Sequence, residues 1–408
     1  MNLQQDKLHN PTGKSRIGLA LVLGLLAILG PLNIDMYLPS FPEISRELGT
    51  GASQVQLSLT ACLIGLALGQ IVVGPISDAQ GRRKPLIIGT SLFALASVFC
   101  ALAPNITVLI VARFLQGFTA AAGVVLSRAV VRDVFSGREM TKFFSLLMVI
   151  NAVAPVVAPM LGGAILAIPS ASWETIFYAL ALIGVLIVVI VGTKLKETLP
   201  PEKRIPSSIG SSVTTMGSLL KDRSFIGYAL VVGFVHGGSF AYVSGTPFVY
   251  QQIYGVSPQV FSILFGINGV AIITGSFIIG RFGGIISEKK LLQAAVTVAA
   301  ASTFILLIMT IIKGPLASLV ILIFIYMTTM GMIITSTFTL GMAKQGGRAG
   351  SASAVLGMLP SLLGAAFTPL SGIAGATAVP MGATLFGTSL IGLIAFMTLI
   401  KKDSEEEY

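Results

Sequence analysis

Charge is the scarcest property of this 408-residue chain: only 10% of its residues are Asp, Glu, Lys or Arg, against 54% hydrophobic residues. A soluble globular domain carries roughly 25% charged residues, so this composition excludes an ordinary soluble fold. The chain also has only two cysteines, two histidines and one tryptophan. No group of His, Cys, Asp and Glu has metal-ligand spacing, and no nucleophile has a visible base partner. The sequence therefore predicts neither a metal centre nor an enzyme active site.

Long apolar segments occupy most of the chain. About 20 apolar residues cross a bilayer as a helix, and the mean hydropathy of +0.91 is typical of a polytopic membrane protein. We predict twelve spans, at residues 17–37, 54–76, 85–103, 106–128, 142–168, 173–193, 224–250, 259–280, 290–312, 316–341, 351–376 and 381–400. The expected fold class is an all-α membrane protein.

One long polar segment, residues 194–223, divides the spans into two sets of six. It contains three prolines, several serines and six basic residues, which is typical of a linker. The expected parts are a tail (1–16), a six-helix bundle (17–193), the linker, a second six-helix bundle (224–400) and a short tail (401–408). The string PMLG at 159–162 recurs as PLSG at 369–372, at corresponding spans. This weak repeat indicates two bundles related by a pseudo-two-fold axis, an arrangement with which transporters build a central site.

Positive charge follows one side of the predicted membrane. With both termini in the cytoplasm, 23 of the 26 basic residues lie on the inward side. Only Arg46 and Lys313 lie outside, and Arg113 lies within a span. This pattern obeys the positive-inside rule. Because the charges recur at span ends and form no basic surface interleaved with aromatic residues, the net charge of +10 predicts no nucleic-acid partner.

Two charged side chains, Asp35 and Arg113, are expected at the depth of lipid. An ionisable group there costs several kcal/mol unless it is paired or faces water, so it marks a functional site by default. Both lie in the outer part of their spans, at similar depth, and we interpret them as the pair that couples protons to substrate. The plainer alternatives are an interfacial acid and an arginine that snorkels to the interface. His236, midway along the seventh span, is either a buried neutral histidine or a proton relay.

The turn between the second and third spans reads GPISDAQGRRKP, residues 74–85. Gly81 permits a tight reversal, and Asp78 can bond to helix amides or to a basic residue. The string resembles the signature loop of the major facilitator superfamily, although Ala79 stands where many members carry a basic residue. The resemblance implies a conformational latch, which holds the outward-open state, made by Gly74, Asp78, Gly81, Arg82 and Arg83. The alternative is a charged turn that only obeys the positive-inside rule.

The fifth span contains NAVAPVVAPMLGG, residues 151–163. Pro155 and Pro159 each remove a backbone donor and bend the helix, while small residues at every fourth position let another helix approach closely. The segment resembles the antiporter motif of drug-efflux members, with Ala158 where glycine usually precedes the proline. It implies export and an antiporter hinge made by Pro155, Pro159, Gly162 and Gly163. A merely structural kink is the alternative.

Two further strings narrow the resemblance. RFLQG at 113–117 resembles the fourth-span arginine motif of the superfamily, and IDMYLP at 34–39 resembles the hallmark of the Bcr/CflA branch, the bicyclomycin-resistance type drug:proton antiporters of bacteria. The resemblance covers residues 17–400. It implies a monomeric multidrug efflux transporter of the bacterial inner membrane, driven by the proton gradient and without a cofactor. The candidate contacts for small-molecule drugs are Asn33, Met36, Tyr37, Gln116, Met148 and His236.

Two alternative functions stay open. One is a superfamily exporter or importer of a specific metabolite such as a sugar, an amino acid or a siderophore, and the fifth span argues against import. The other is a membrane-embedded enzyme or a non-transporting receptor. It is disfavoured because the sequence has no catalytic constellation and no sizeable soluble domain.

Overall fold

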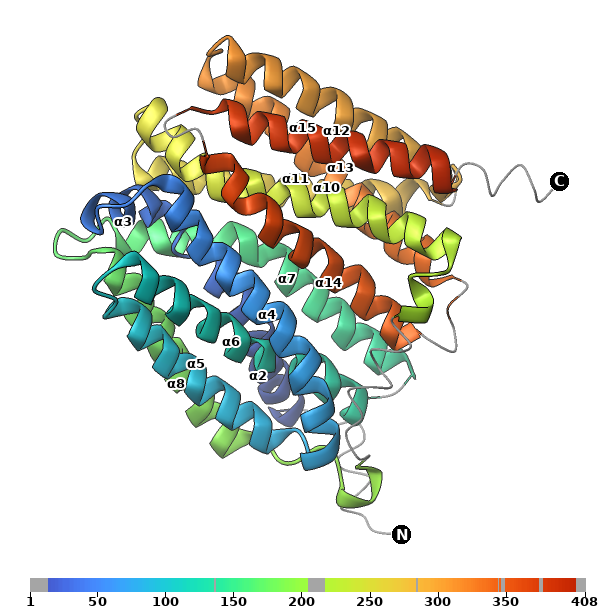
Figure 1. The fold of residues 1–408 in the computed structure, drawn as a ribbon. Helices are drawn as coiled ribbons and strands as arrows, with labels where there is room; N and C mark the ends of the chain where they lie inside the picture. Colours follow the sequence, from blue (N-terminus) through green and yellow to red (C-terminus); the bar gives the residue numbers. More distant parts are fainter. Residues whose placement is uncertain are drawn as a thin grey trace. The chain divides into compact units, whose positions relative to one another are not determined.

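The computed structural model describes residues 14–135, 137–204, 217–283, 285–343, 345, 349–373 and 377–400, and all regular structure among them is helical (Figure 1). The long helices are α2 (Lys14–Asp35), α4 (Ala52–Gln80), α5 (Arg83–Ala101), α6 (Ile106–Val134), α7 (Gly137–Ile165), α8 (Trp173–Lys194), α10 (Arg223–Phe248), α11 (Pro258–Phe282), α12 (Glu288–Ile311), α13 (Leu316–Met342), α14 (Ala349–Phe367) and α15 (Val379–Ala395). Shorter elements are η1 (Leu38–Ser40), α3 (Phe41–Glu47), η2 (Pro201–Lys203), η3 (Val249–Ile253), η5 (Thr368–Gly372) and η6 (Phe396–Ile400).

The helices have the length and apolarity that a bilayer requires. Among the described residues, 11 segments are long and apolar enough to span a membrane, and α7 adds the shorter apolar stretch Val153–Ile165. On α8 the exposed side chains form one apolar stripe at helical spacing: Tyr178, Leu182, Val185, Leu186 and Val189. A stripe of this kind is stable against lipid and costly in water. The predicted all-α membrane fold is therefore confirmed.

The chain packs into two compact units, whose boundary differs from the expected linker. The first comprises the described parts of 1–37 and 61–209, and the second those of 38–60 and 210–408. Residues 38–60 pack with the second unit through backbone carbonyls there: Thr60 Oγ1 donates to the Ala365 carbonyl at 3.1 Å. In a regular helix the Ala365 carbonyl would accept a hydrogen bond from the N–H four residues later. That residue is Pro369, which has no N–H, so the Ala365 oxygen can accept from Thr60 instead.

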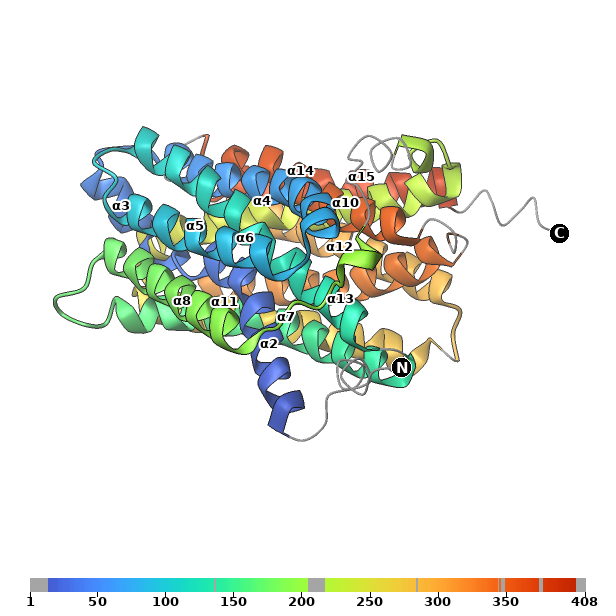
Figure 2. The same cartoon turned by 90° about the horizontal axis from the view of Figure 1, so that it is seen from below.

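The same helix pairs recur inside each unit. In the first, α2 packs against α6, α7 and α8, and α5 lies between α6 and α8, as Figure 2 shows. In the second, α10 packs against α13, α14 and α15, and α12 packs against α13 and α15. The order of spans is therefore the same in both packing schemes, as expected for the two halves of a repeated bundle.

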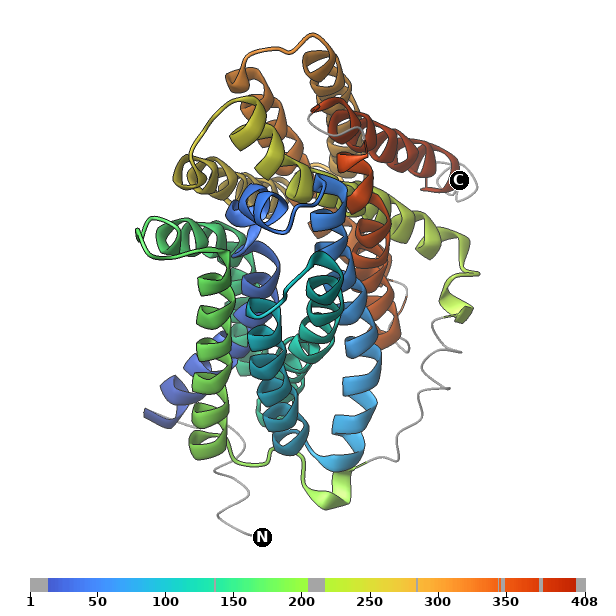
Figure 3. The ribbon, with the colours of Figure 1, turned by 60° about the vertical axis from the view of Figure 1, so that its left-hand side comes forward.

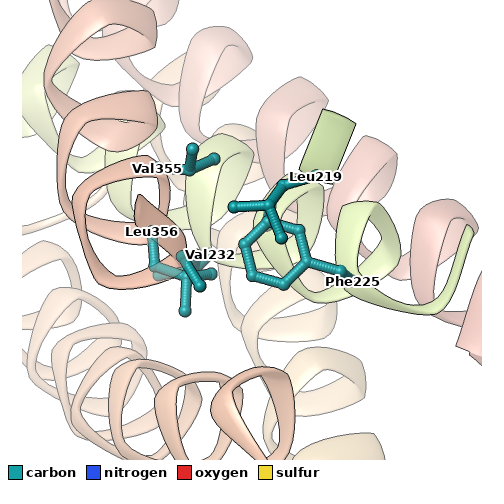
Figure 4. Packing of buried hydrophobic residues seen from close by; sticks show 7 residues of the cluster. Leu219, Phe225, Val232, Val355 and Leu356 are labelled. Atoms are coloured by element: carbon teal, nitrogen blue, oxygen red, sulfur yellow. The ribbon is translucent and has the colours of Figure 1, made fainter. Parts of the chain in front are cut away.

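The last part of the expected linker packs against the second unit. Leu219 and Phe225 are buried with Val232 of α10 and with Val355 and Leu356 of α14 (Figure 4). The Asp222 side chain accepts a hydrogen bond from the Phe225 N–H and thereby caps the start of α10. The apolar cluster fixes the point at which the chain enters its second six helices.

Two glycines allow close backbone contacts that position the site in the first unit. A Cβ added to Gly117 on α6 would lie 2.1 Å from the Cys62 carbonyl oxygen of α4, and one at Gly162 on α7 would lie 1.9 Å from that of Met36. No side chain fits such distances, so α4 and α6 touch at Cys62, while α7 touches the chain directly after α2. The small-residue seam predicted in the fifth span is present at Gly162.

Candidate functional site

A fully buried arginine forms the centre of the first unit. Arg113 Nη1 donates to Asn33 Oδ1 at 2.7 Å and to Gln116 Oε1 at 2.5 Å, and Nη2 donates to the Asn33 carbonyl oxygen at 2.9 Å. All three residues are 0% exposed. We call Arg113, Asn33 and Gln116 the arginine centre. Since both amide partners are neutral, the centre carries one net positive charge.

The end of α2 explains why a carbonyl oxygen is available to Arg113. The helix stops at Asp35, and the last four carbonyls of a helix have no partner within it. Leu32 O accepts from the Met36 N–H at 3.1 Å, while Asn33 O accepts from the guanidinium of α6. Arg113 therefore both binds the Asn33 side chain and satisfies the frayed end of the first span.

Aromatic rings surround the guanidinium. The Arg113 Cζ atom lies 4.2 Å from the centroid of the Tyr37 ring and 5.7 Å from that of Phe177 on α8. A cation over an aromatic face gains roughly 2 kcal/mol when the pair is desolvated. The sole tryptophan, Trp173, meets Phe177 edge to face at a centroid distance of 6.0 Å. The rings compensate the charge in part and exclude water from it.

Asp35 lies beside this centre in sequence but makes no ion pair with it. Its side chain is 7% exposed, and within the described residues no hydrogen bond or ion pair engages its carboxyl group. The guanidinium of Arg113 binds amides instead. The structure thus leaves the acid and the arginine, which the sequence presents as an opposed pair, without direct contact.

The other candidate drug contacts divide between the units. Met36 and Tyr37 are buried at 2% and 0% exposure next to the arginine centre. His236 is half-buried on α10, in the second unit, with its ring stacked on Phe240 at 5.8 Å. The side chain of Met148 lies outside the described residues. Asn33, Tyr37 and Gln116 therefore meet at Arg113, whereas His236 belongs to a different body.

A second polar cluster lies at the turn between α4 and α5. Arg82, 2% exposed, donates to Asp78 at 2.6 Å, to Asp133 of α6 at 2.7 Å and to the Ser77 hydroxyl at 2.7 Å. Gly81 has φ +94°, a conformation that favours glycine, and makes the predicted tight reversal. At Gly74 an added Cβ would meet no atom of the described residues within 4 Å.

Glu197, three residues after the end of α8, completes this turn cluster. Its carboxylate accepts from the backbone N–H of Arg82 at 2.7 Å and of Arg83 at 3.1 Å, at the start of α5. Burial alone would raise the pKa of Glu197, but bonds from four backbone amides more than offset this and lower it. Figure 3 shows the segment that follows, η2, beside the end of α4. The start of the expected linker is thus anchored to the turn.

The amide bonds predict that Glu197→Gln destabilises the first unit. Glutamine keeps one acceptor oxygen but loses the charge that favours α5's N-terminus, so we expect a Tm lower by roughly 2 °C at neutral pH. Because the folded pKa lies below the unfolded one, the stability from Glu197 is present above about pH 4.5 and is lost as the pH falls further. Thermal unfolding of the purified protein across pH tests this. Glu202→Gln, an exposed acid five residues on, should leave Tm unchanged at every pH.

Several residues of both clusters escape notice in the sequence. Asp133 and Glu197 stand among basic residues and count there only as compensating charge. The two cysteines read as small hydrophobes, yet both are hydrogen-bonded to the arginine centre. Helical spacing offered one signal: Ser97 and Cys100 are three residues apart on α5 and so share a face. Among the described residues no three His, Cys, Asp or Glu side chains form a metal-binding group.

Two units of matching helix order, apolar helices of bilayer length and a buried cationic centre define a multi-pass membrane transporter. The chain belongs to the Major Facilitator Superfamily, whose family model matches residues 23–369.

Similar proteins support this assignment. The chain is 73% identical over 395 residues to the uncharacterized MFS-type transporter YdgK of Bacillus subtilis, covering 97% of this chain and 98% of the relative. It is 31% identical over 391 residues to a bicyclomycin resistance protein homolog of Haemophilus influenzae, covering 96% and 98%. A bacterial homolog of the human lysosomal transporter Spinster, solved inward-facing, shares the fold with a TM-score of 0.72, 15% identity and coverage of 96% and 98%.

Proposed function

We propose that this transporter exports small, chemically varied toxic compounds in exchange for protons, as a member of the bicyclomycin-resistance branch. The buried Asp35 carboxyl group carries the proposal. Within the described part of the chain it has no cationic partner, although Arg113 is anchored to Asn33 two residues earlier. Burial without a partner is costly for a carboxylate and tolerable for the neutral acid. Such a group changes its proton occupancy when its surroundings become wet.

Exchange then follows from alternating access. When the site opens outward, Asp35 takes a proton from the external medium and the compound leaves. When it opens inward, Asp35 releases the proton to the cytoplasm and the anionic carboxylate becomes an anchor for the next compound. No covalent bond forms, and the proton gradient is the energy source.

Arg113 fixes the electrostatics of this cycle. A permanently charged guanidinium held by two amides keeps one positive charge in the pocket in every state. Asn33, Tyr37 and Gln116 offer polar contacts, and Met36 offers an adaptable apolar one. The similarity to a bicyclomycin resistance protein homolog over 96% of the chain supports drugs as the substrate class. The distribution of basic residues supports a topology with both termini in the cytoplasm.

Susceptibility profiles test the proposal most directly. We expect cells that express the gene to tolerate higher concentrations of at least two chemically unrelated antimicrobials than cells without it. The purified protein in proteoliposomes should release protons when such a compound is added. Proton-driven uptake of a metabolite, with unchanged drug tolerance, would instead identify an importer. Binding without any flux would identify a receptor.

A further inference from the structure

Both thiols of the chain contact residues of the arginine centre. Cys62 Sγ on α4 accepts a hydrogen bond from Asn33 Nδ2 at 3.1 Å, and Cys100 Sγ on α5 donates to Gln116 Oε1 at 3.4 Å. Both cysteines are 0% exposed. Ser97, also 0% exposed, accepts from Gln116 Nε2 at 2.7 Å. These three side chains touch the amides of the centre, and in the described structure none of them is hydrogen-bonded to Arg113 itself.

The contacts determine which end of each amide meets the cation. A primary amide has an acceptor oxygen and a donor nitrogen, and only the oxygen can bind a guanidinium, which has donors alone. The Asn33 nitrogen is engaged by Cys62 and the Gln116 nitrogen by Ser97. Both oxygens are thereby turned to Arg113. Without that acceptor the amide nitrogen would be buried and unsatisfied, which favours a displaced amide even though the guanidinium still attracts its oxygen.

We propose that Cys62 and Ser97 are positioning residues of the arginine centre, which orient the amides of Asn33 and Gln116 so that both oxygens bind the guanidinium. Cys100 reinforces the second amide by donating to the same oxygen as Arg113. This rests on the proposed function, in which Arg113 sets the charge of the proton-coupled pocket. The positions are fixed by the backbone: Gly117 brings α6 against the Cys62 carbonyl, and the Ser97 hydroxyl donates to Phe93 O at 2.8 Å, so its lone pairs remain for Gln116.

A crossed set of substitutions distinguishes an acceptor from a small hydrophobe at position 62. Cys62→Ser keeps an acceptor but is more polar, whereas Cys62→Ala and Cys62→Val are apolar and accept nothing. If Cys62 positions Asn33, we expect Ala and Val to lower kcat/KM for drug-dependent proton release by roughly tenfold and to displace its pH profile. Serine should restore the wild-type profile. The opposite order, with serine impaired and alanine normal, would overturn the proposal.

At position 97 the matched pair is Ser97→Ala and Thr90→Val. Thr90 has a fully buried hydroxyl on the same helix, and among the described residues it bonds only to carbonyls of that helix, at Leu86 and Ile87. We expect Ser97→Ala to displace the pH profile and Thr90→Val to leave it in place. Equal displacement by both would show that loss of packing, and not orientation of Gln116, causes the effect.

A measurement that needs no transport separates this proposal from the proposed function. The S–H stretching band of Cys100, isolated in Cys62→Ser, reports the bond to Gln116 Oε1 because hydrogen bonding lowers its frequency. We expect Ser97→Ala to raise that frequency as the amide turns away, and Thr90→Val to leave it unchanged. An unchanged band in Ser97→Ala refutes the positioning role. If Ser97→Ala shifts the band but the protein without that change exchanges no protons, the proposed function is refuted and the positioning role stands.

Discussion

Replacing Asp35 with asparagine is expected to reduce drug-dependent proton release to the level measured without protein. The amide has nearly the same volume and no charge, so the buried site at the end of α2 should remain folded. It cannot take up or release a proton at any relevant pH. Drug-induced proton release by the purified variant, measured with a pH dye in weakly buffered solution, gives the result.

Two controls make the Asp35 result interpretable. Glu47→Gln removes an acid at the exposed end of α3 and should leave proton release intact. The fluorescence of Trp173, which contacts Phe177 beside the arginine centre, reports drug binding without transport. An Asp35→Asn variant that still exports drug against a gradient with proton counterflow would remove Asp35 from the mechanism. His236 would then be the next residue to test.

Much of the architecture could be predicted because it depends on properties that each segment carries by itself. Apolar length, for example, gives each membrane-spanning segment. The boundary of the second unit could not be predicted in this way. Residues 38–60 join it through hydrogen bonds to carbonyls of α10 and α14, such as those of Ser244 and Ala365. Gln56 and Ser244 are 188 residues apart in the sequence, and Thr60 and Ala365 are 305 residues apart.

The candidate site shows the same division. Asp35 and Arg113 are conspicuous because charge is rare in the spans. The residues around Arg113 are not conspicuous: Asn33 and Gln116, which bind it, and Cys62 and Ser97, which bind those amides, are uncharged and lie on four different helices. Their opposite signs and similar depth led to the interpretation of the acid and the arginine as one coupling pair. The guanidinium donates instead from Nη1 and Nη2 to two amides and a helix-end carbonyl, at 2.5 to 2.9 Å.

Substitution of Arg113 is expected to have the second largest effect, and its size should depend on the geometry of the replacement. Arg113→Ala leaves Asn33 Oδ1 and the Asn33 carbonyl buried without their donor, and it leaves Gln116 Oε1 with the Cys100 thiol as its remaining donor. Each unsatisfied buried group costs about 1–3 kcal/mol, so we expect a large fall in Tm together with loss of exchange. Arg113→Lys retains the charge, but its single ammonium cannot reproduce the planar fork that spans Oδ1 and the backbone oxygen of Asn33.

The lysine variant therefore separates charge from geometry. If a fixed positive charge in the pocket is sufficient, Arg113→Lys should keep most of the proton release seen in the wild type. If the two-nitrogen clamp on Asn33 is needed, it should fold, bind drug by Trp173 fluorescence and release few protons. The clamp ties α6 to the last turn of α2 at Asn33, two residues before Asp35. We therefore expect the second result. Full exchange by Arg113→Lys would show that the bonds to Asn33 serve stability only, and that the charge acts on Asp35 through space.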